Sequence, residues 1–216
     1  MINHLYHNLL SDSSFNKLNP LIIGSFAIQY YTGFYREVND IDLVCKQNAI
    51  QQIQDIILNH NFRLNENFPL NKFCMEYQSS DDSALIHLVA DKLSILNENY
   101  TKEQFAYDFC VYFNDCENFK KEFIIDNHQY QILIPKIEDL IVMKFLPILY
   151  SNSVDKQFSK KHIQDLEILI NKCSEIDEEY YKERIRSERN IIKRIKMNYE
   201  HYNDTIRKFL EKHNIC

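Results

Sequence analysis

Residues 21–44 read LIIGSFAIQYYTGFYREVNDIDLV, and this stretch holds both glycines of the 216-residue chain, Gly24 and Gly33. Glycine tolerates a positive φ and allows a close approach to the main chain. The apolar run before Gly24 predicts a buried strand, after which Gly24 turns the chain into a helix. The exposed N–H groups at the start of such a helix favour phosphate, and Gly33 suits the end of that helix.

The same stretch closes with the sequence Asp40-Ile-Asp42. On a strand, the side chains at positions i and i+2 share one face, so Asp40 and Asp42 are predicted to project together. Two adjacent carboxylates are unfavourable unless a cation neutralises them. Hard divalent cations such as Mg²⁺ take carboxylate and phosphate oxygens. A glycine turn followed by paired carboxylates therefore predicts a metal–phosphate site.

This constellation resembles the nucleotidyltransferase superfamily, and within it the polymerase β-like minimal nucleotidyltransferases and the AbiEii/MenT-type toxins. The family pattern is a glycine turn that opens a helix, then an Arg, then Asp-x-Asp on the next strand. The matching residues here are Gly24, Ser25, Arg36, Asp40 and Asp42. The resemblance implies that the two aspartates hold Mg²⁺ (or Mn²⁺), while Gly24 and Ser25 bind the triphosphate of an NTP. Arg36 is open to two roles, a phosphate contact or an ion pair that anchors its loop.

Two later positions also match the family, Lys144 and Asp165. The resemblance implies that Lys144 neutralises charge on the triphosphate and that Asp165 organises either Lys144 or the acceptor. The alternative for Lys144 is a surface or interdomain lysine, and the alternative for Asp165 is an aspartate on a helix surface.

The stretch Ala-Leu-Ile-His-Leu-Val at 84–89 departs from the family pattern. It carries His87 where many members of the superfamily have a third metal carboxylate. His87 is open to four roles: metal ligand, base, substrate contact or hydrogen-bonded strand histidine. Glu76, on the neighbouring predicted strand, is a candidate for the missing acid.

Hydrophobic periodicity predicts an α+β protein. We expect a mixed sheet with flanking helices over residues 1–133, in the manner of a nucleotidyltransferase, and a C-terminal helical bundle over residues 134–216. The predicted strands are at 21–23, 41–45, 73–78, 84–89, 107–113, 123–125 and 130–133. Apolar residues spaced three and four apart from Ile192 to Phe209 predict one long last helix.

The composition of the chain bears on the cellular compartment and the binding partners that we expect for the protein. The six cysteines form no CxxC pair, which argues against a zinc site. The sequence shows neither a secretory signal nor an apolar run of membrane-spanning length, so we expect a reduced, cytoplasmic protein without a membrane partner. The formal net charge is −6, yet Lys182–Lys212 holds ten Lys and Arg against five Asp and Glu. Such a basic stretch fits either a phosphate-bearing partner or a solvated helix face.

These observations favour a metal-dependent nucleotidyltransferase that transfers an NMP from an NTP to an acceptor. By resemblance to the toxins, the expected acceptor is tRNA, and a cognate antitoxin protein is an expected partner. Two alternatives stay open. One is an antibiotic nucleotidyltransferase with an aminoglycoside or lincosamide acceptor. The other is a catalytically inactive binding module with a nucleotidyltransferase-like fold.

Overall fold

The structure is a computed structural model that describes residues 4–33, 38, 40–66, 74–90, 120–125, 128–150, 156–172, 176–187 and 191–215. The described residues form two compact units, one with the residues up to Pro135 and one with the residues from Lys136 onward. The predicted strand at 107–113 and the predicted site residue Arg36 lie outside the described residues.

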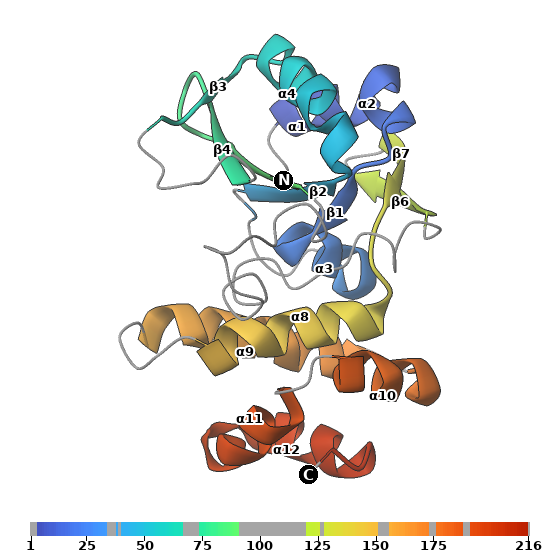
Figure 1. The fold of residues 1–216 in the computed structure, drawn as a ribbon, viewed down its shortest axis with the longest axis vertical. Coiled ribbons are helices and arrows are strands. Elements are labelled where there is room, and N and C mark those ends of the chain that lie inside the picture. The colour runs from blue at the N-terminus through green and yellow to red at the C-terminus, as the bar shows by residue number, and fades with distance from the viewer. Residues whose placement is uncertain are drawn as a thin grey trace. The chain divides into compact units, whose positions relative to one another are not determined.

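Among the described residues, a seven-stranded mixed sheet forms the centre of the first unit (Figure 1). Its strands are β1 (Leu21–Ile23), β2 (Asp40–Cys45), β3 (Phe62–Leu64), β4 (Cys74–Ser79), β5 (Leu85–Ala90), β6 (Lys120–Ile125) and β7 (His128–Leu133). They lie in the order β3-β4-β5-β2-β1-β7-β6. The pairs β2/β5 and β1/β7 are parallel, and the other neighbouring pairs are antiparallel.

Helices flank both faces of this sheet. They are α1 (His4–Ser11), α2 (Ser13–Lys17), α3 (Gly24–Thr32) and α4 (Ile50–Asn59). In Figure 1, α1, α2 and α4 lie on one face of the sheet and α3 lies on the other. The helix α3 connects two adjacent antiparallel strands, β1 and β2, so it remains beside the strand that carries the acidic pair.

Over residues 40–43 of β2, the side chains alternate between the apolar core on one face and acidic groups on the other. Ile41 and Leu43 are fully buried, and each contributes about 1.5–3 kcal/mol of hydrophobic stabilisation. Asp40 and Asp42 are half-buried on the opposite face. The parallel neighbour β5 presents His87 directly opposite Asp42. The pairing of β2 with β5 therefore brings the acidic pair and the histidine to one face of the sheet.

The second unit is helical. Its elements are α8 (Ile137–Tyr150), α9 (Lys156–Lys172), α10 (Glu178–Ser187), α11 (Ile191–Met197) and α12 (Asp204–Lys212). The helix α8 packs against α9, α10 and α11, and α12 packs against α9. Apolar side chains fill these contacts, among them the fully buried Phe145, Leu166 and Ile206.

The expectation of one long last helix is wrong. The chain leaves α11 after Met197, passes through a 3₁₀ turn at Tyr199–His201 and starts again as α12. Asn203 causes the restart, because its side chain accepts a hydrogen bond from the Ile206 N–H at 3.0 Å and caps the new helix.

The predicted α+β class is confirmed, with a mixed sheet and flanking helices in one unit and a helical second unit. Within the described part of the chain, no helix has both the length and the apolar character needed to cross a membrane.

Candidate metal and nucleotide site

The site begins where β1 ends. In the antiparallel pair of β1 and β2, Ile23 lies opposite Asp42. Gly24 follows at once and opens α3, so the first turn of this helix starts beside the acidic pair. The structure thus brings the glycine turn and the Asp-x-Asp motif together, and their binding of phosphate and metal stays a prediction.

Gly24 is required at this point for two reasons. Its φ is +68°, a value that residues with a Cβ seldom adopt. A Cβ at Gly24 would also overlap the Oδ2 atom of Asp42 and would lie 3.1 Å from its Cγ. The carboxylate of Asp42 therefore occupies the space that a side chain at Gly24 would fill. The sequence predicts that this glycine admits a phosphate, which stays a prediction; the structure shows that it admits the acidic side chain of Asp42.

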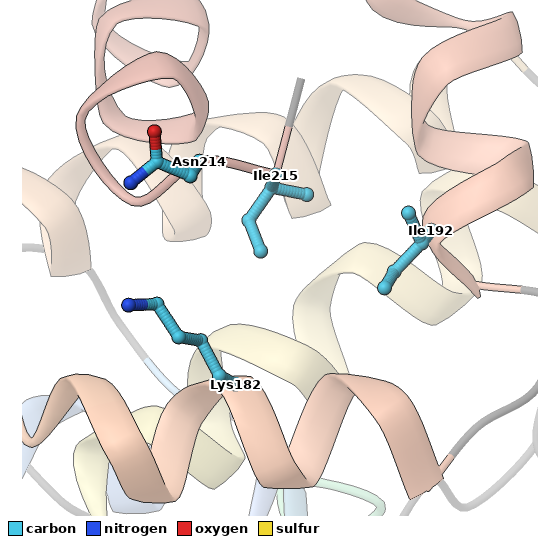
Figure 2. Close-up of a pocket in the computed structure, with 4 residues that line it drawn as sticks. All are labelled: Lys182, Ile192, Asn214 and Ile215. Atoms are coloured by element: carbon cyan, nitrogen blue, oxygen red, sulfur yellow. The ribbon is translucent and has the colours of Figure 1, made fainter.

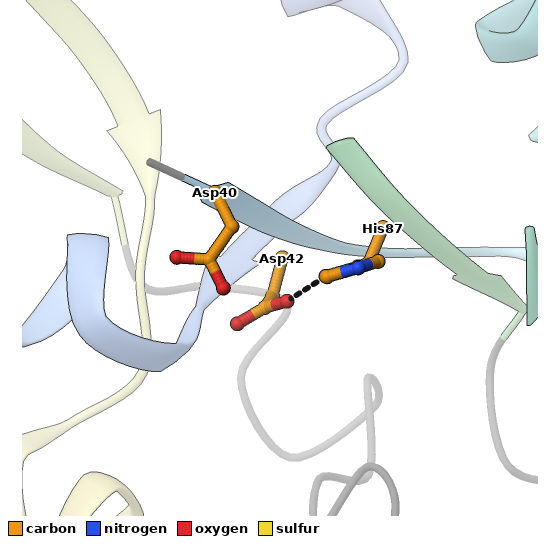
Figure 3. Close-up of side chains that lie close together, drawn as sticks. All are labelled: Asp40, Asp42 and His87. Atoms are coloured by element: carbon orange, nitrogen blue, oxygen red, sulfur yellow. Dashed lines mark hydrogen bonds and ion pairs between the residues drawn. The ribbon is translucent and has the colours of Figure 1, made fainter. Parts of the chain in front are cut away.

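Three side chains form the candidate metal group, Asp40, Asp42 and His87 (Figure 3). Each offers one ligand atom, and these atoms lie within 4.8 Å of one another. All three side chains are half-buried. Two carboxylates on adjacent positions of one strand face give the oxygen donors that Mg²⁺ prefers. The donor set thus fits a divalent cation, and Gly24 leaves the Asp42 carboxylate the room that it needs.

His87 joins two acidic side chains. Its Nδ1 lies 2.8 Å from the Asp42 Oδ1, and its Nε2 lies 3.0 Å from the Glu76 Oε2. Carboxylate oxygens accept, so both ring nitrogens act as donors in this geometry. Burial disfavours the protonated ring, but the hydrogen bonds to Asp42 and Glu76 and the charge of Asp40 outweigh it and raise the pKa of His87 to about 9.

The start of α3 is the candidate phosphate-binding end of this helix. Its N-cap is Ile23, and no side chain among the described residues caps this end. The first N–H groups of a helix carry partial positive charge and suit an anion. Ser25, the second predicted nucleotide-binding residue, is buried at this end with 5% of its surface exposed.

The other two predicted catalytic residues lie in the helical unit. Lys144 of α8 and Asp165 of α9 form an ion pair of 2.8 Å. Both are buried, with 4% and 0% of their surface exposed. The structure therefore brings these two residues together, and it rejects the alternative that they are ordinary surface residues. Their part in catalysis stays a prediction.

Some basic side chains of the stretch Lys182–Lys212 are paired with acidic side chains, so its composition overstates the positive charge that it presents to a partner. The Arg184 side chain is buried, and its Nε donates to the Asp139 Oδ1 at 2.7 Å. Tyr180 donates to the other oxygen of Asp139 at 2.9 Å. Lys182 pairs with Glu178 at 3.2 Å. In contrast, Lys193 and Lys196 of α11 are exposed.

The helical unit also contains a pocket of about 230 Å³. Lys182, Ile192, Asn214 and Ile215 line it, as Figure 2 shows. Among the described residues of its lining, the polar groups are one ammonium and one amide, and the others are aliphatic. These groups provide none of the carboxylates that the metal group of the first unit provides.

Comparison with known proteins identifies the fold. No protein-family model matches the sequence, and no curated protein matches it. Among solved structures, that of the antibiotic-resistance factor ANT(2'')-Ia in solution superposes with a TM-score of 0.56 at 15% identity, covering 92% of this chain and 97% of that chain. The crystal structure of ANT(2'')-Ia in complex with adenylyl-2''-tobramycin gives a TM-score of 0.56 at 16% identity, covering 87% and 96%.

A third structure agrees. An antigenic nucleotidyltransferase-like protein from Paracoccidioides brasiliensis superposes with a TM-score of 0.57 at 15% identity, and the match covers 97% of this chain and 91% of that chain. At such identities the comparison establishes a shared fold. The chain has a nucleotidyltransferase fold, so the predicted resemblance to the superfamily is confirmed at this level. The closer likeness to AbiEii/MenT-type toxins stays a prediction.

Proposed function

We propose that this chain is a metal-dependent nucleotidyltransferase that transfers an NMP from an NTP to an acceptor. One observation carries the proposal. Asp40 and Asp42 share a strand face directly beside the glycine turn that opens α3, with Gly24 and Asp42 in close contact. Paired carboxylates next to a helix N-terminus supply metal ligands and phosphate donors at one place.

The reaction needs an oxygen of the acceptor to attack the α-phosphorus of the NTP. The bond from that phosphorus to the pyrophosphate oxygen breaks, pyrophosphate leaves, and the proton of the acceptor hydroxyl passes to solvent water. Bound divalent cations stabilise charge on the attacking and leaving oxygens of such a displacement. Asp40 and Asp42 would hold the metal, and the N–H groups at Gly24 and Ser25 would orient the phosphates. We assign to Lys144 the neutralisation of charge on the triphosphate, and to Asp165 the positioning of Lys144.

For the acceptor, we propose tRNA. We propose a cytoplasmic enzyme whose activity is inhibited by an antitoxin protein. The support is the predicted likeness to the toxins and the exposed lysines of α11. A second candidate acceptor is a small antibiotic. The fold shared with ANT(2'')-Ia favours it, since that protein has been seen with adenylyl-2''-tobramycin.

A transfer assay tests the proposal. The full chain is incubated with each α-³²P-labelled NTP, Mg²⁺ or Mn²⁺, and either total tRNA or a panel of aminoglycosides and lincosamides. We expect label on one acceptor class in the presence of metal and no label in EDTA. The Asp42→Asn variant, which keeps the side-chain volume and removes the charge, is expected to be inactive.

Isothermal titration with each NTP in the presence of Mg²⁺ separates the enzyme from an inactive binding module. Nucleotide binding without transfer to either acceptor class would favour the binding module. Transfer by Asp42→Asn at the wild-type rate would contradict the metal-site assignment.

A further inference from the structure

A row of polar side chains crosses the sheet and ends at the candidate metal site. Glu76 of β4 lies opposite His87 of β5, and His87 lies opposite Asp42 of β2. Residues that are directly opposite on neighbouring strands point to the same face and contact each other. The register therefore accounts for the two hydrogen bonds, His87 to Asp42 at 2.8 Å and His87 to Glu76 at 3.0 Å.

At the end of the row away from Asp42, Glu76 is hydrogen-bonded to Asn65. Asn65, just beyond β3, donates its side-chain N–H to the Glu76 Oε1 at 2.6 Å, and its backbone N–H donates to the Glu76 carbonyl at 2.9 Å. Glu76 itself is buried, with 8% of its surface exposed. Each of its carboxylate oxygens thus has a donor, one from His87 of β5 and one from Asn65, which follows β3.

The near end of the row fixes the orientation of Asp42. His87 binds the Oδ1 atom, and the Oδ2 atom lies against Gly24 at the start of α3. One carboxylate oxygen is therefore fixed by a hydrogen bond, and the other lies where only a glycine leaves room for it. To bind a metal, a ring nitrogen of His87 would have to give up its hydrogen bond to Asp42 or to Glu76.

We propose that Glu76 and His87 are positioning residues that hold the Asp42 carboxylate in its metal-binding orientation. Many nucleotidyltransferases have a third metal-binding acid at the position of His87. Here His87 hydrogen-bonds to Asp42, the second acid, and is itself hydrogen-bonded to Glu76. The inference rests on the proposed function, because it takes Asp42 as a metal ligand. Residues that hydrogen-bond to a metal ligand orient it, and their loss commonly lowers metal affinity or activity by about 10–100-fold.

Variants at Glu76 test this role. Glu76→Gln keeps the size of the side chain and replaces one acceptor oxygen with a donor, and Glu76→Ala removes both acceptors. Gln78→Ala is the matched control, since Gln78 lies on the same strand and face two residues away. Mn²⁺ affinity is measured on the full chain by electron paramagnetic resonance, thermal unfolding is measured in EDTA, and kcat and KM for the NTP are measured in the transfer assay.

We expect both Glu76 variants to bind Mn²⁺ about 10–100-fold more weakly than wild type. We also expect kcat to fall more than KM rises when metal is limiting, and saturating Mn²⁺ to restore part of kcat. Gln78→Ala is expected to match wild type in all three measurements. Unchanged Mn²⁺ affinity in folded Glu76→Gln protein would overturn the inference, as would a loss of thermal stability alone.

The Asp42→Asn variant separates this inference from the proposed function. If Asp42→Asn loses Mn²⁺ binding and Glu76→Gln does not, only the positioning role fails. If Asp42→Asn binds Mn²⁺ as wild type does, the metal site itself is wrong.

Discussion

Gly24 shows how much one missing side chain contributes to this site. Its positive φ makes the sharp turn from β1 into α3, and its lack of a Cβ gives the Asp42 carboxylate a place to lie. Gly33, at the other end of α3, also has a positive φ of +72°, but a Cβ there would meet nothing within 4 Å. The two glycines therefore allow backbone strain to be separated from contact with the acidic pair.

We predict that Gly24→Ala and Gly33→Ala each lose roughly 1–2 kcal/mol of unfolding free energy, because alanine is disfavoured at a positive φ. Only Gly24→Ala should also weaken Mn²⁺ binding, since its methyl group displaces Asp42. Chemical denaturation and Mn²⁺ titration of both variants measure the two effects. Equal Mn²⁺ affinity in the two variants would show that the contact with Asp42 has no part in metal binding.

The buried pair of Lys144 and Asp165 supports a second prediction at this scale. Removing one member leaves the other as an uncompensated buried charge, so Lys144→Met or Asp165→Leu alone should cost about 3–5 kcal/mol of stability. The double variant should recover most of that loss, because two apolar side chains replace the pair. Denaturation curves of the three proteins measure these differences.

Activity then tests the role that the family resemblance gives to Lys144. If Lys144 neutralises the triphosphate, the stable double variant has no transfer activity. Wild-type transfer by the double variant would leave the pair with a structural role only.

Single residues also show which parts of the site the sequence could predict. Gly24, Asp40 and Asp42 carry local signals, since a glycine turn and an i, i+2 spacing are visible in one short segment. The contacts of His87 depend on strand register, and a shift of one residue reverses every side chain of a strand. Arg184 appeared in a basic run, but its ion pair with Asp139, 45 positions away, could not be inferred from that run.

Among the elements, α2 depends on a single capping residue. Asp12 accepts hydrogen bonds from the N–H groups of Ser14 and Phe15 at 2.7 and 3.2 Å, and its other oxygen pairs at 3.0 Å with His60, the C-cap residue of α4. The hydrogen bond to His60, together with the two backbone N–H groups, lowers the pKa of Asp12. A carboxyl group whose pKa is lowered on folding stabilises the fold above its unfolded pKa, and this contribution is lost as the pH falls.

We therefore predict that Asp12→Ala loses about 1 kcal/mol of unfolding free energy at neutral pH, which is typical for an N-cap. The gap between the variant and wild type should narrow below about pH 4, where aspartate takes up its proton. Asp12→Asn keeps the cap without the charge and should show a smaller, less pH-dependent loss. A gap for Asp12→Ala that stays constant down to pH 3 would contradict the contribution of the charge.

The elements with strong local patterns were predicted, and those that depend on pairing or caps were not. The strand β1, the helix α3 and the hairpin of β4 and β5 follow from glycine, alternation and a polar turn. The strand β3 is only three residues long and forms by pairing with β4 at the edge of the sheet. The break before α12 was missed because the apolar spacing continues across it, although Asn203 carries the capping signal.

At the scale of the whole molecule, charge bears on the choice of acceptor. The chain has a formal net charge of −6, so any attraction to RNA must come from a local surface. Within the basic stretch, Arg184 forms an ion pair with Asp139, whereas Lys193 and Lys196 of α11 are exposed. A protein that contacts phosphates releases counterions, so its binding weakens steeply as salt rises.

If tRNA is the acceptor, we predict that its apparent affinity falls on a log–log plot against salt with a slope of about −0.7 to −0.9 per phosphate contact. Lys193→Glu/Lys196→Glu should lower transfer to tRNA and reduce that slope, while NTP and Mn²⁺ affinities stay at wild-type values. The control is Lys17→Glu/Lys160→Glu, a reversal of two exposed lysines outside this stretch. Transfer that is insensitive to salt, or equally affected by both double variants, would remove α11 as the RNA-binding surface. A small antibiotic as acceptor predicts instead that transfer is indifferent to the charge of α11.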